Sequence, residues 1–186
     1  MTHTVFIDGA AGTTGLEIVE RLAPRSEFKL LVLDDEQRKS AAARRDAYHA
    51  ADFAVLCLPD EAAVEAVAMA EGSKARIIDA SSAHRVAPGW IYGFPELIGR
   101  EKIANASRVS NPGCYPTGFL GLVTPLTRNG LLHRDQHYVC HAVSGYSGGG
   151  KALIQRFEAP GAPAFCRYAL SGHHKHLAEM TEYAEL

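Results

Sequence analysis

The stretch Val5-Phe6-Ile7-Asp8-Gly9-Ala10-Ala11-Gly12-Thr13-Thr14-Gly15 decides the fold of this chain. Its apolar start predicts a short strand, and the glycine-rich turn that follows leads into a helical pattern with Leu16, Val19 and Leu22 on one face. Strand, glycine-rich turn and helix form the unit that binds a dinucleotide, because glycines let the backbone approach a pyrophosphate and the helix N-terminus donates N–H groups to it. The spacing is G-x-x-G-x-x-G instead of the more usual G-x-G-x-x-G, so a purely structural turn is the alternative.

Further strands and helices alternate along the first half of the chain. Strands are predicted at 28–33, 52–58 and 75–80, and a helix is predicted to begin at Asp60 as its N-cap. The core face of that helix is predicted to consist of Ala63, Val64, Val67 and Ala68. This alternation predicts an α/β fold with a parallel sheet, whose ligands bind at the carboxyl ends of the strands. Gly9–Gly15, Leu58-Pro59, Ser81-Ser82 and Cys114 then lie along one edge, so a cofactor and a thiol can meet there.

The residues after the second predicted strand bear on the cofactor's phosphate. Asp34 and Asp35 stand about twenty residues beyond the glycines, where an acid would bind a ribose hydroxyl and favour NAD. Arg38 and Lys39 follow closely and could instead hold a 2′-phosphate. A solvated loop is the third interpretation, so these residues leave NAD and NADP undecided.

The heptapeptide Asn111-Pro112-Gly113-Cys114-Tyr115-Pro116-Thr117 places a cysteine between a Pro-Gly turn and a second proline. An extended segment at 108–110 gives way here to a helix predicted at 116–129, and proline is tolerated in the first turn of a helix. Unpaired N–H groups and the helix dipole favour an anion at that end, so the Cys114 thiol is expected to ionise readily and act as a nucleophile. The alternative is a buried structural cysteine that closes the turn.

A strand predicted at 137–143 precedes a glycine-rich loop, Ser144 to Lys151. The loop fits G-x-x-x-x-G-K, but Ala152 stands where a P-loop needs a hydroxyl for magnesium, so a nucleotide triphosphatase is excluded. The backbone N–H groups of the loop, with Ser147 and Lys151 beside them, could still hold an anionic substrate group. A flexible hinge is the alternative.

Three histidines stand together in His173-His174-Lys175-His176. No carboxylate or cysteine lies at a helpful local spacing, which argues against a metal site. Histidine titrates near neutral pH, so proton transfer to or from a thiol or a departing oxygen is the chemistry favoured here. For each of the three, an exposed histidine at a helix start is the alternative.

Composition narrows the class of protein. The chain has 186 residues, of which 47% are hydrophobic and 22% charged, enough for one domain with a core or for one domain and part of another. A net charge of -2 and a pI near 6.5 argue against nucleic acid and anionic membrane as partners. The sequence shows neither a membrane span nor a signal pattern, so a cytoplasmic location is the default expectation. The four cysteines are scattered without a C-x-x-C pair, which argues against structural zinc and a disulfide scaffold.

The string N-P-G-C-Y-P-T-G, Asn111 to Gly118, resembles the nucleophile motif of the N-acetyl-gamma-glutamyl-phosphate reductases, NADP-dependent enzymes of arginine biosynthesis. The loop at 144–150 resembles the family's S-G-x-S-G-x-G segment, which helps to form the acyl-phosphate pocket. The string H-K-H-L-x-E-M resembles its H-[RK]-H-x-x-E-[IM] motif, whose acid-base histidine maps to His174. Arg85, after the serines at 81–82, resembles an arginine that meets the substrate's carboxylate or phosphate; taken singly, it could equally be a surface arginine.

The resemblance implies a covalent mechanism. The Cys114 thiolate attacks the acyl phosphate of N-acetylglutamyl phosphate, phosphate leaves, and a thioester stays on the enzyme. NADPH then gives a hydride to the thioester carbon, and His174 protonates the collapsing thiohemiacetal as the aldehyde departs. Backbone N–H groups near Gly113 and Cys114 are natural donors for the developing oxyanion.

The expected architecture is a Rossmann-like NADP-binding domain at 1–113, followed at 114–186 by part of an α+β catalytic and dimerisation domain. The resemblance implies a small acyl-phosphate substrate, NADP as cofactor and a homo-oligomer when full length. No metal ligand is expected. The candidate catalytic residues are Cys114 and His174. The candidate substrate-binding residues are Arg85, Ser147, Tyr168 and His176. The candidate cofactor-binding residues are Gly9, Ala10, Gly12, Thr13, Thr14, Gly15, Arg38, Pro59 and Ser81.

The chain departs from the family in its length. Family members continue past the H-K-H helix with further strands, so the chain ending at Leu186 resembles a truncated member, whose second sheet would have unpaired edges. Two rival functions stay open: a sister acyl-phosphate reductase acting on an aspartyl or aminoadipyl analogue, and a catalytically dead fragment that binds the cofactor. The second predicts NADPH binding without a readily labelled thiol.

Overall fold

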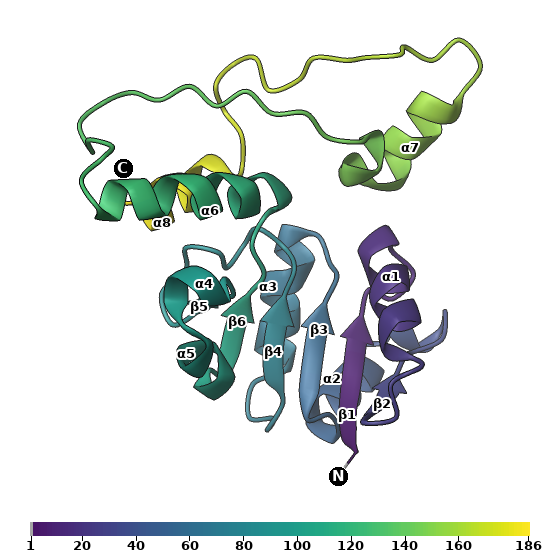
Figure 1. Ribbon diagram of the computed structural model, residues 1–186. Coiled ribbons are helices and arrows are strands. Elements are labelled where there is room, and N and C mark those ends of the chain that lie inside the picture. Colours follow the sequence, from purple (N-terminus) through teal and green to yellow (C-terminus); the bar gives the residue numbers. More distant parts are fainter. Residues whose placement is uncertain (1) are drawn as a thin grey trace. The chain divides into compact units, whose positions relative to one another are not determined.

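The computed structural model describes residues 2–186, and the chain divides into two compact units. Gly113 closes the first unit and Cys114 opens the second. In the first unit a six-stranded sheet has the strand order β2-β1-β3-β4-β6-β5, and all its pairs are parallel (Figure 1). The strands are β1 His3–Asp8, β2 Phe28–Leu31, β3 Phe53–Leu56, β4 Arg76–Asp79, β5 Ile91–Tyr92 and β6 Arg108–Ser110. The prediction of an α/β fold with a parallel sheet is confirmed.

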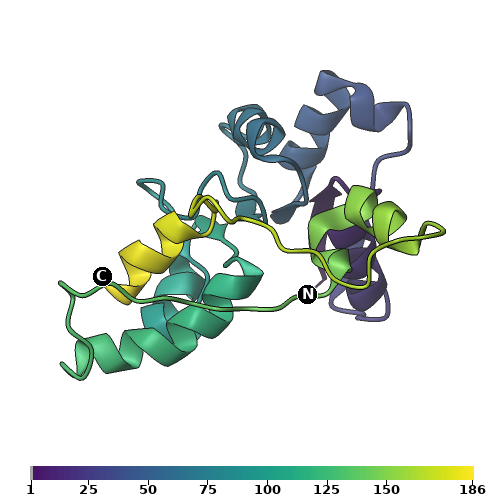
Figure 2. The same ribbon diagram turned by 90° about the horizontal axis from the view of Figure 1, so that it is seen from above.

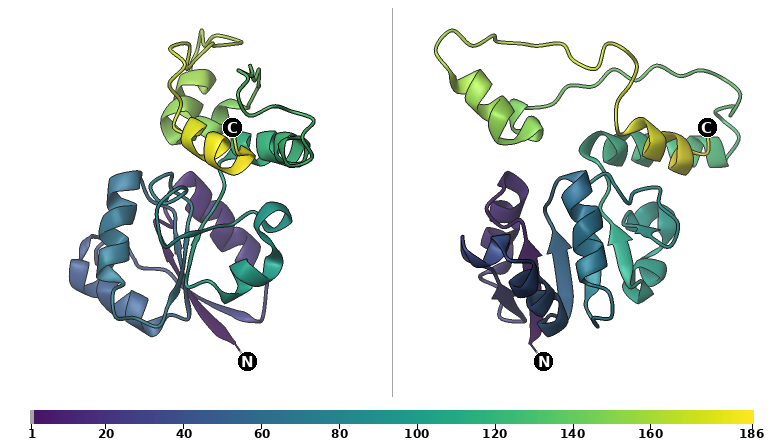
Figure 3. Two further views of the ribbon diagram at one scale, coloured as in Figure 1. Left: turned by 90° about the vertical axis from the view of Figure 1, so that its left-hand side faces the viewer. Right: turned by 180° about the vertical axis from the view of Figure 1, so that it is seen from behind.

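Helices cover both faces of this sheet (Figure 3). They are α1 Thr13–Leu22, η1 Gln37–Lys39, α2 Ala41–Ala50, α3 Asp60–Met69, α4 Pro95–Ile98 and α5 Arg100–Asn105. One core cluster joins buried side chains of the central strands, such as Phe6 and Leu56, to Tyr48 of α2 and the alanines of α3. A second cluster, around Val5 and Ile7 on the opposite face of β1, packs against α1. Successive residues of β1 thus pack against the helices on opposite faces of the sheet, because side chains alternate along a strand.

Several local predictions were wrong. The second strand ends at Leu31, two residues before the predicted end. Asp60 is the first residue of α3 and Pro59 is its N-cap, because the Asp60 carboxylate accepts hydrogen bonds from the N–H and hydroxyl of Ser82 instead. Leu16 and Val64, placed on core faces by periodicity, are 55% and 53% exposed. Ala63 and Ala66 form the buried face of α3, and their small side chains allow the helix to lie close to the sheet.

The second unit contains α6 Cys114–Arg128, η2 Tyr146–Gly149, α7 Gly150–Glu158 and α8 Leu177–Ala184. The helices α6 and α8 lie side by side (Figure 2). Hydroxyl groups of α6 fix the end of α8, since Thr124 donates to the carbonyl of Tyr183 at 3.2 Å and Thr127 donates to that of Ala184 at 2.8 Å. The predicted helix at 116–129 is confirmed, with two more residues at its start.

The strand predicted at 137–143 is not formed. Residues 137–145 are irregular, and Val139 and Val143 are 81% and 88% exposed. A strand is stabilised by hydrogen bonds to a neighbouring strand, and residues 114–186 contain no strand at all. Within the described residues of this unit, the alternating segment therefore has no neighbouring strand with which to form hydrogen bonds.

Candidate functional site

One row of residues marks the carboxyl edge of the sheet. Asp8 of β1 pairs with Leu56 of β3, Leu56 with Asp79 of β4, and Asp79 with Ser110 of β6. The loops that follow these strands, at 9–15, 57–59, 80–82 and 111–113, therefore all leave the sheet at one edge. In open α/β sheets this is the edge at which ligands bind.

The glycine turn between β1 and α1 has no room for side chains at two positions. Gly9 has φ +88°, and a Cβ on it would stand 2.3 Å from the carbonyl oxygen of Cys57. A Cβ on Gly15 would stand 2.3 Å from the carbonyl oxygen of Gly9. The turn is closed by a hydrogen bond from the Gly12 N–H to the Gly9 carbonyl, and the first i to i−4 bond of α1 runs from Leu16 to Gly12. The N–H groups of the first turn of α1 thus lie at an end where a pyrophosphate can accept from them.

The loop after β2 keeps both kinds of cofactor contact available. Asp34 accepts the N–H groups of Glu36 and Gln37 through Oδ1, at 3.0 and 2.8 Å, so its carboxylate caps its own turn. Arg38, in η1, forms a 2.8 Å ion pair with Asp35, and both side chains are largely exposed. Exposed pairs of this kind are weak, so a phosphate could displace Asp35 from the Arg38 guanidinium.

Asp79, at the end of β4, orders the loop that contains Ser81. Its fully buried carboxylate accepts the N–H of Ser81 at 2.9 Å and the Ser81 hydroxyl at 2.6 Å. It also contacts Nδ1 of His84 at 2.6 Å, and the His84 ring stacks on Trp90 at 4.1 Å. Ser81 is thus held in place beside the end of β3, where Pro59 begins α3.

Asp8 and Cys57 show how apolar and crowded this edge is. The Asp8 carboxylate is bound by Tyr48 at 2.5 Å and by Arg44 at 2.8 Å. Burial, together with the negative charges of Asp79 and Asp8, raises the pKa of the Cys57 thiol to about 11. Cys57 therefore stays protonated at neutral pH and is a poor nucleophile.

Arg85 is not a surface arginine, since it is only 7% exposed. Its guanidinium donates to the carbonyl of Asn111 at 3.1 Å and to that of Ala80 at 3.3 Å. These bonds tie the loop after β4 to the turn that precedes Cys114. A substrate contact of Arg85 stays a prediction, because the described contacts lead to backbone carbonyls.

Cys114 is the first residue of α6 and its side chain is exposed. The thiol therefore lies at a helix N-terminus, where the positive end of the helix dipole favours an anion. Pro116 lies fully buried in this turn, a position where its missing N–H costs nothing. The alternative of a buried structural cysteine is excluded.

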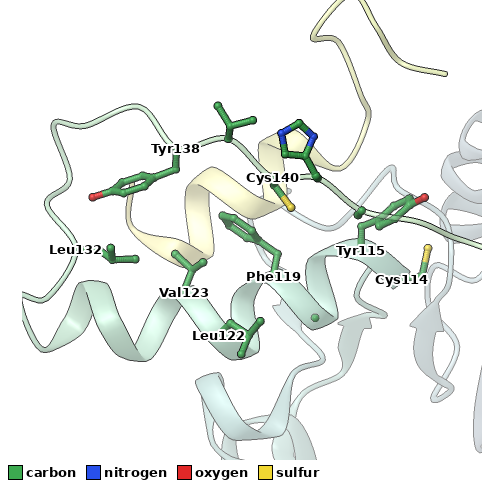
Figure 4. A pocket seen from close by; sticks show the side chains of 12 residues that line it. Cys114, Tyr115, Phe119, Leu122, Val123, Leu132, Tyr138 and Cys140 are labelled. Carbon is green, nitrogen blue, oxygen red and sulfur yellow. The ribbon is translucent and has the colours of Figure 1, made fainter. Parts of the chain in front are cut away.

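An apolar hollow of about 490 Å³ runs along α6 from Cys114 (Figure 4). Phe119 and Val123 of the helix face Tyr138 and Cys140 of the segment that follows it. Cys114 and Tyr115 lie at one end of this hollow. The second unit thus gives the thiol an accessible and largely apolar surrounding.

Four rings gather next to Cys114. Tyr115 contacts the rings of His174, His176 and Tyr168 at centroid distances of 6.0, 6.1 and 6.5 Å. The Tyr168 ring lies 5.9 Å from that of His174, and the two histidine rings lie 4.6 Å apart. The structure thus brings three predicted residues, Tyr168, His174 and His176, together around one that was not predicted.

The tautomer of His174 follows from its hydrogen bond. The backbone N–H of His176 donates to Nδ1 of His174 at 3.2 Å, so the neutral ring has its proton on Nε2. His174 is therefore arranged to donate a hydrogen bond from Nε2. His173 is exposed, and His176 is only 5% exposed at the N-cap of α8, which excludes an exposed helix-start role for His176.

The hydroxyl of Tyr168 donates to that of Tyr115 at 2.5 Å. The pKa of Tyr168 is raised to about 12, mainly because the hydroxyl loses solvent. This hydrogen bond and the negative charges that Tyr115 and Cys114 can acquire raise the pKa further, whereas a hydrogen bond with Ser144 lowers it. Ser144 is thus the loop hydroxyl that reaches the cluster. Ser147 and Lys151 lie in η2 and at the start of α7, apart from α6 and α8 (Figure 1).

Sequence reasoning missed Tyr115 and Ser144. In the sequence, Tyr115 is recognisable only as a neighbour of the cysteine, and Ser144 only as the first residue of the glycine loop.

In residues 2–186 no group of three or more His, Cys, Asp or Glu side chains could hold a metal ion. None of the helices in the described part is long and apolar enough to cross a membrane.

Comparison with known proteins gives consistent matches along the chain. Residues 4–106 match the family model for semialdehyde dehydrogenase, NAD binding domain, and residues 114–186 match that for semialdehyde dehydrogenase, dimerisation domain. N-acetyl-gamma-glutamyl-phosphate reductase 2 of Pseudomonas putida is 53% identical over 190 residues, which cover 100% of this chain and 61% of that protein. N-acetyl-gamma-glutamyl-phosphate reductase of Burkholderia cenocepacia is 52% identical over 189 residues, with 98% and 60% coverage.

Among solved structures, aspartate semialdehyde dehydrogenase II from Vibrio cholerae superposes with a TM-score of 0.67 at 16% identity. The superposition covers 100% of this chain and 67% of that one, and shows that the fold is shared. The chain spans about 60% of the length of the two relatives named above.

Proposed function

The chain belongs to the semialdehyde dehydrogenase family, and from this premise we propose that it supplies the cofactor unit and the nucleophile of an N-acetyl-gamma-glutamyl-phosphate reductase. Such an enzyme reduces N-acetyl-gamma-glutamyl phosphate to N-acetylglutamate 5-semialdehyde with release of phosphate. The observation that carries the proposal is Cys114 at the first residue of α6, adjoining the ring cluster that contains His174. Relatives half identical to this chain have the same name, which supports this substrate over other acyl phosphates.

The first unit fits a nicotinamide dinucleotide. Gly9 and Gly15 have no room for a Cβ, so the backbone before and at the start of α1 is not covered by side chains at these positions. A pyrophosphate needs such a backbone in order to approach its N–H groups. In our proposal residues 9–15 hold the pyrophosphate, and Pro59 and Ser81 line the same edge. Bound NADPH would supply the hydride that reduces the acyl group.

We propose NADP over NAD because of the loop after β2. Asp34 uses Oδ1 for the N–H groups of its own turn, which leaves it less suited to a ribose hydroxyl. Arg38 is exposed in the same loop and pairs only weakly with Asp35, so its guanidinium can accept a phosphate in exchange.

The chemistry of the second unit follows from its own groups. The Cys114 thiol loses its proton to solvent, and the thiolate attacks the acyl carbon. The bond from that carbon to the phosphate oxygen then breaks, inorganic phosphate leaves, and the acyl group stays on sulfur as a thioester. The N–H groups of the first turn of α6 stabilise negative charge on the sulfur and on the oxygen of the tetrahedral intermediates. His174, with its proton on Nε2, donates to that oxygen as charge develops.

The test is reduction of NADP by this chain with N-acetylglutamate semialdehyde and phosphate. We expect phosphate-dependent turnover that falls to background in Cys114→Ser and is kept in Cys166→Ser, a matched change of a thiol outside the cluster. A higher kcat/KM for aspartate semialdehyde would transfer the proposal to that substrate. Equal rates for Cys114→Ser and the parent would end it.

A separate binding experiment tests the cofactor. Titration of NADPH and NADH by fluorescence is expected to show tighter NADPH binding that Arg38→Gln weakens by roughly tenfold, with NADH unaffected. Arg21→Gln, which removes a still more exposed arginine from α1, serves as the control. An equal loss for both cofactors would refute a phosphate contact of Arg38.

The family model of the second unit is described as a dimerisation domain, and we propose that the complete protein forms a homo-oligomer through it. Light scattering after size-exclusion chromatography measures the oligomeric state directly, and a monomer at micromolar concentration would contradict this part of the proposal.

A further inference from the structure

Tyr115 is the centre of the four-ring cluster. It contacts all three other rings, and it is the only member of the cluster that belongs to α6, the helix that begins with Cys114. The other three rings come from the residues just before α8. Tyr115 therefore joins the thiol's helix to the segment that contains the histidines.

The histidine segment has no regular secondary structure to fix it. Residues 159–176 form no helix or strand, so no regular backbone ladder determines where His174 lies. At its far end, α8 is fixed to α6 by the hydroxyl groups of Thr124 and Thr127. At its near end, the contacts of the segment with α6 include those of the Tyr115 ring and the hydrogen bond from Tyr168.

We propose that Tyr115 is a positioning residue that holds His174 beside the Cys114 thiol. This inference rests on the proposed function, in which the two groups act on the same substrate atoms. The Tyr115 ring is the wall against which the imidazole packs edge-on, at an interplanar angle of 86°. The hydroxyl of Tyr168 in turn fixes the Tyr115 phenol.

Two properties of the cluster suit this role. The hydroxyl of Tyr168 is a phenol and stays protonated at neutral pH, so it persists as a donor to Tyr115. A tyrosine ring also has only two rotatable bonds, so it positions a neighbour at a low cost in side-chain entropy.

The experiment measures alkylation of Cys114 by iodoacetamide near neutral pH, with peptide mass spectrometry to separate it from the other cysteines. A hydrogen bond from His174 to the thiolate should change the reaction rate by roughly tenfold, as expected for a bond to a charged group. We therefore expect about tenfold slower alkylation in His174→Ala and in Tyr115→Leu. The double variant should be no slower than His174→Ala alone, because Tyr115 acts through His174.

Phenylalanine variants test the hydroxyl bond without removing a ring. Tyr115→Phe and Tyr168→Phe are each expected to slow alkylation about threefold, and the pair together no more than either alone, since both remove one neutral hydrogen bond. Tyr146→Phe removes a hydroxyl that bonds to Glu158 elsewhere in the same unit and should leave the rate unchanged. Circular dichroism of each variant confirms that the helices are retained.

The proposal would be overturned if the double variant Tyr115→Leu/His174→Ala were alkylated more slowly than His174→Ala by the same factor that separates Tyr115→Leu from the parent. Such a result would mean that Tyr115 affects the thiol independently of His174. An unchanged rate in Tyr115→Leu would overturn it as well. If the coupling is found but phosphate-dependent turnover is absent, the positioning role stands and the substrate assignment falls. If turnover is found but the Tyr115 and His174 variants are not coupled, the proposed enzyme class stands and the positioning role of Tyr115 is refuted.

Discussion

Gly15→Ala tests whether the turn between β1 and α1 is built by backbone contact. Gly15 lies inside α1, where alanine is intrinsically favoured over glycine by about 1 kcal/mol. The added Cβ would stand 2.3 Å from the oxygen of Gly9, 2.7 Å from Cα of Ala10 and 2.9 Å from the carbonyl carbon of Gly9. A substitution that should stabilise an ordinary helix is therefore expected to destabilise this one.

The magnitude follows from what would have to move. Ordinary contact begins at 3.4 Å, so the Gly9 carbonyl must withdraw by about 1 Å. It cannot withdraw freely, because a substituent on Gly9 would meet the Cys57 carbonyl at 2.3 Å. Overpacking of this kind costs about 3 kcal/mol at the upper end of the usual range. After the helix-forming gain, the net loss in unfolding free energy is about 2 kcal/mol.

Gly118→Ala is the matched control, because Gly118 also lies inside a helix but nothing stands within 4 Å of its would-be Cβ. Hydrogen exchange of peptides from α1 and α6, with urea unfolding of the whole chain, measures both variants. We expect about 2 kcal/mol less protection in α1 for Gly15→Ala and about 0.5–1 kcal/mol more in α6 for Gly118→Ala. NADPH affinity should fall at least roughly tenfold in Gly15→Ala only, since the turn is displaced. Equal stabilisation of both helices, or unchanged NADPH binding in Gly15→Ala, would refute the argument.

Three further predictions concern buried or paired groups. The raised pKa of Cys57, about 11, should make its alkylation near neutral pH about 100-fold slower in the native chain than in urea; equal rates would contradict its burial. Tyr48→Phe removes a hydrogen bond to Asp8 and should lower the urea-unfolding free energy by about 1.5 kcal/mol. The pKa of Asp52 is lowered by hydrogen bonds from Lys74 and the backbone, so its contribution is present above its ordinary pKa and is lost as the pH falls through the folded value. Asp52→Asn should therefore be less stable than the parent near neutral pH and equally stable in strong acid, as measured by urea unfolding across pH.

The parts of the fold that could be predicted are those fixed by local constraints. The glycine turn at 9–15 could be recognised because glycine is the residue that such a turn requires, and the sheet followed from apolar runs that alternate with helices. The buried face of α3 could be predicted only in part: Ala63 is buried and Val67 packs against the core as predicted, but periodicity favours Val64 as strongly as Ala66. Which of them is buried depends on how closely the helix lies against the sheet. α2 was missed because its sequence, Ala41 to Ala50, is mostly alanine and charged residues without large aliphatic side chains, and it buries only Ala47 and Tyr48.

The candidate site shows the same division. Cys114 at the start of a helix could be predicted, because the prolines and glycine around it constrain the backbone locally. The cluster around Tyr115 could not, because its members are separated by more than fifty residues of sequence and meet only through the packing of α8 on α6. The strand expected at 137–143 failed for a related reason, since alternation indicates a surface but does not supply the neighbouring strand that strand formation needs.

The turn that precedes Cys114 is held by backbone groups and by one arginine of the first unit. The N–H of Asn111 donates to the carbonyl of Asp79 at 2.7 Å, and the carbonyl of Asn111 accepts from Arg85 at 3.1 Å. Asn111 is therefore held to the edge of the sheet through both its N–H and its carbonyl. A lysine at position 85 has a single ammonium group, which cannot reproduce the planar fork that reaches the carbonyls of Ala80 and Asn111 together. Arg85 can thus affect the thiol through the backbone alone, and a loss of activity in an Arg85 variant would not by itself show that this residue touches the substrate.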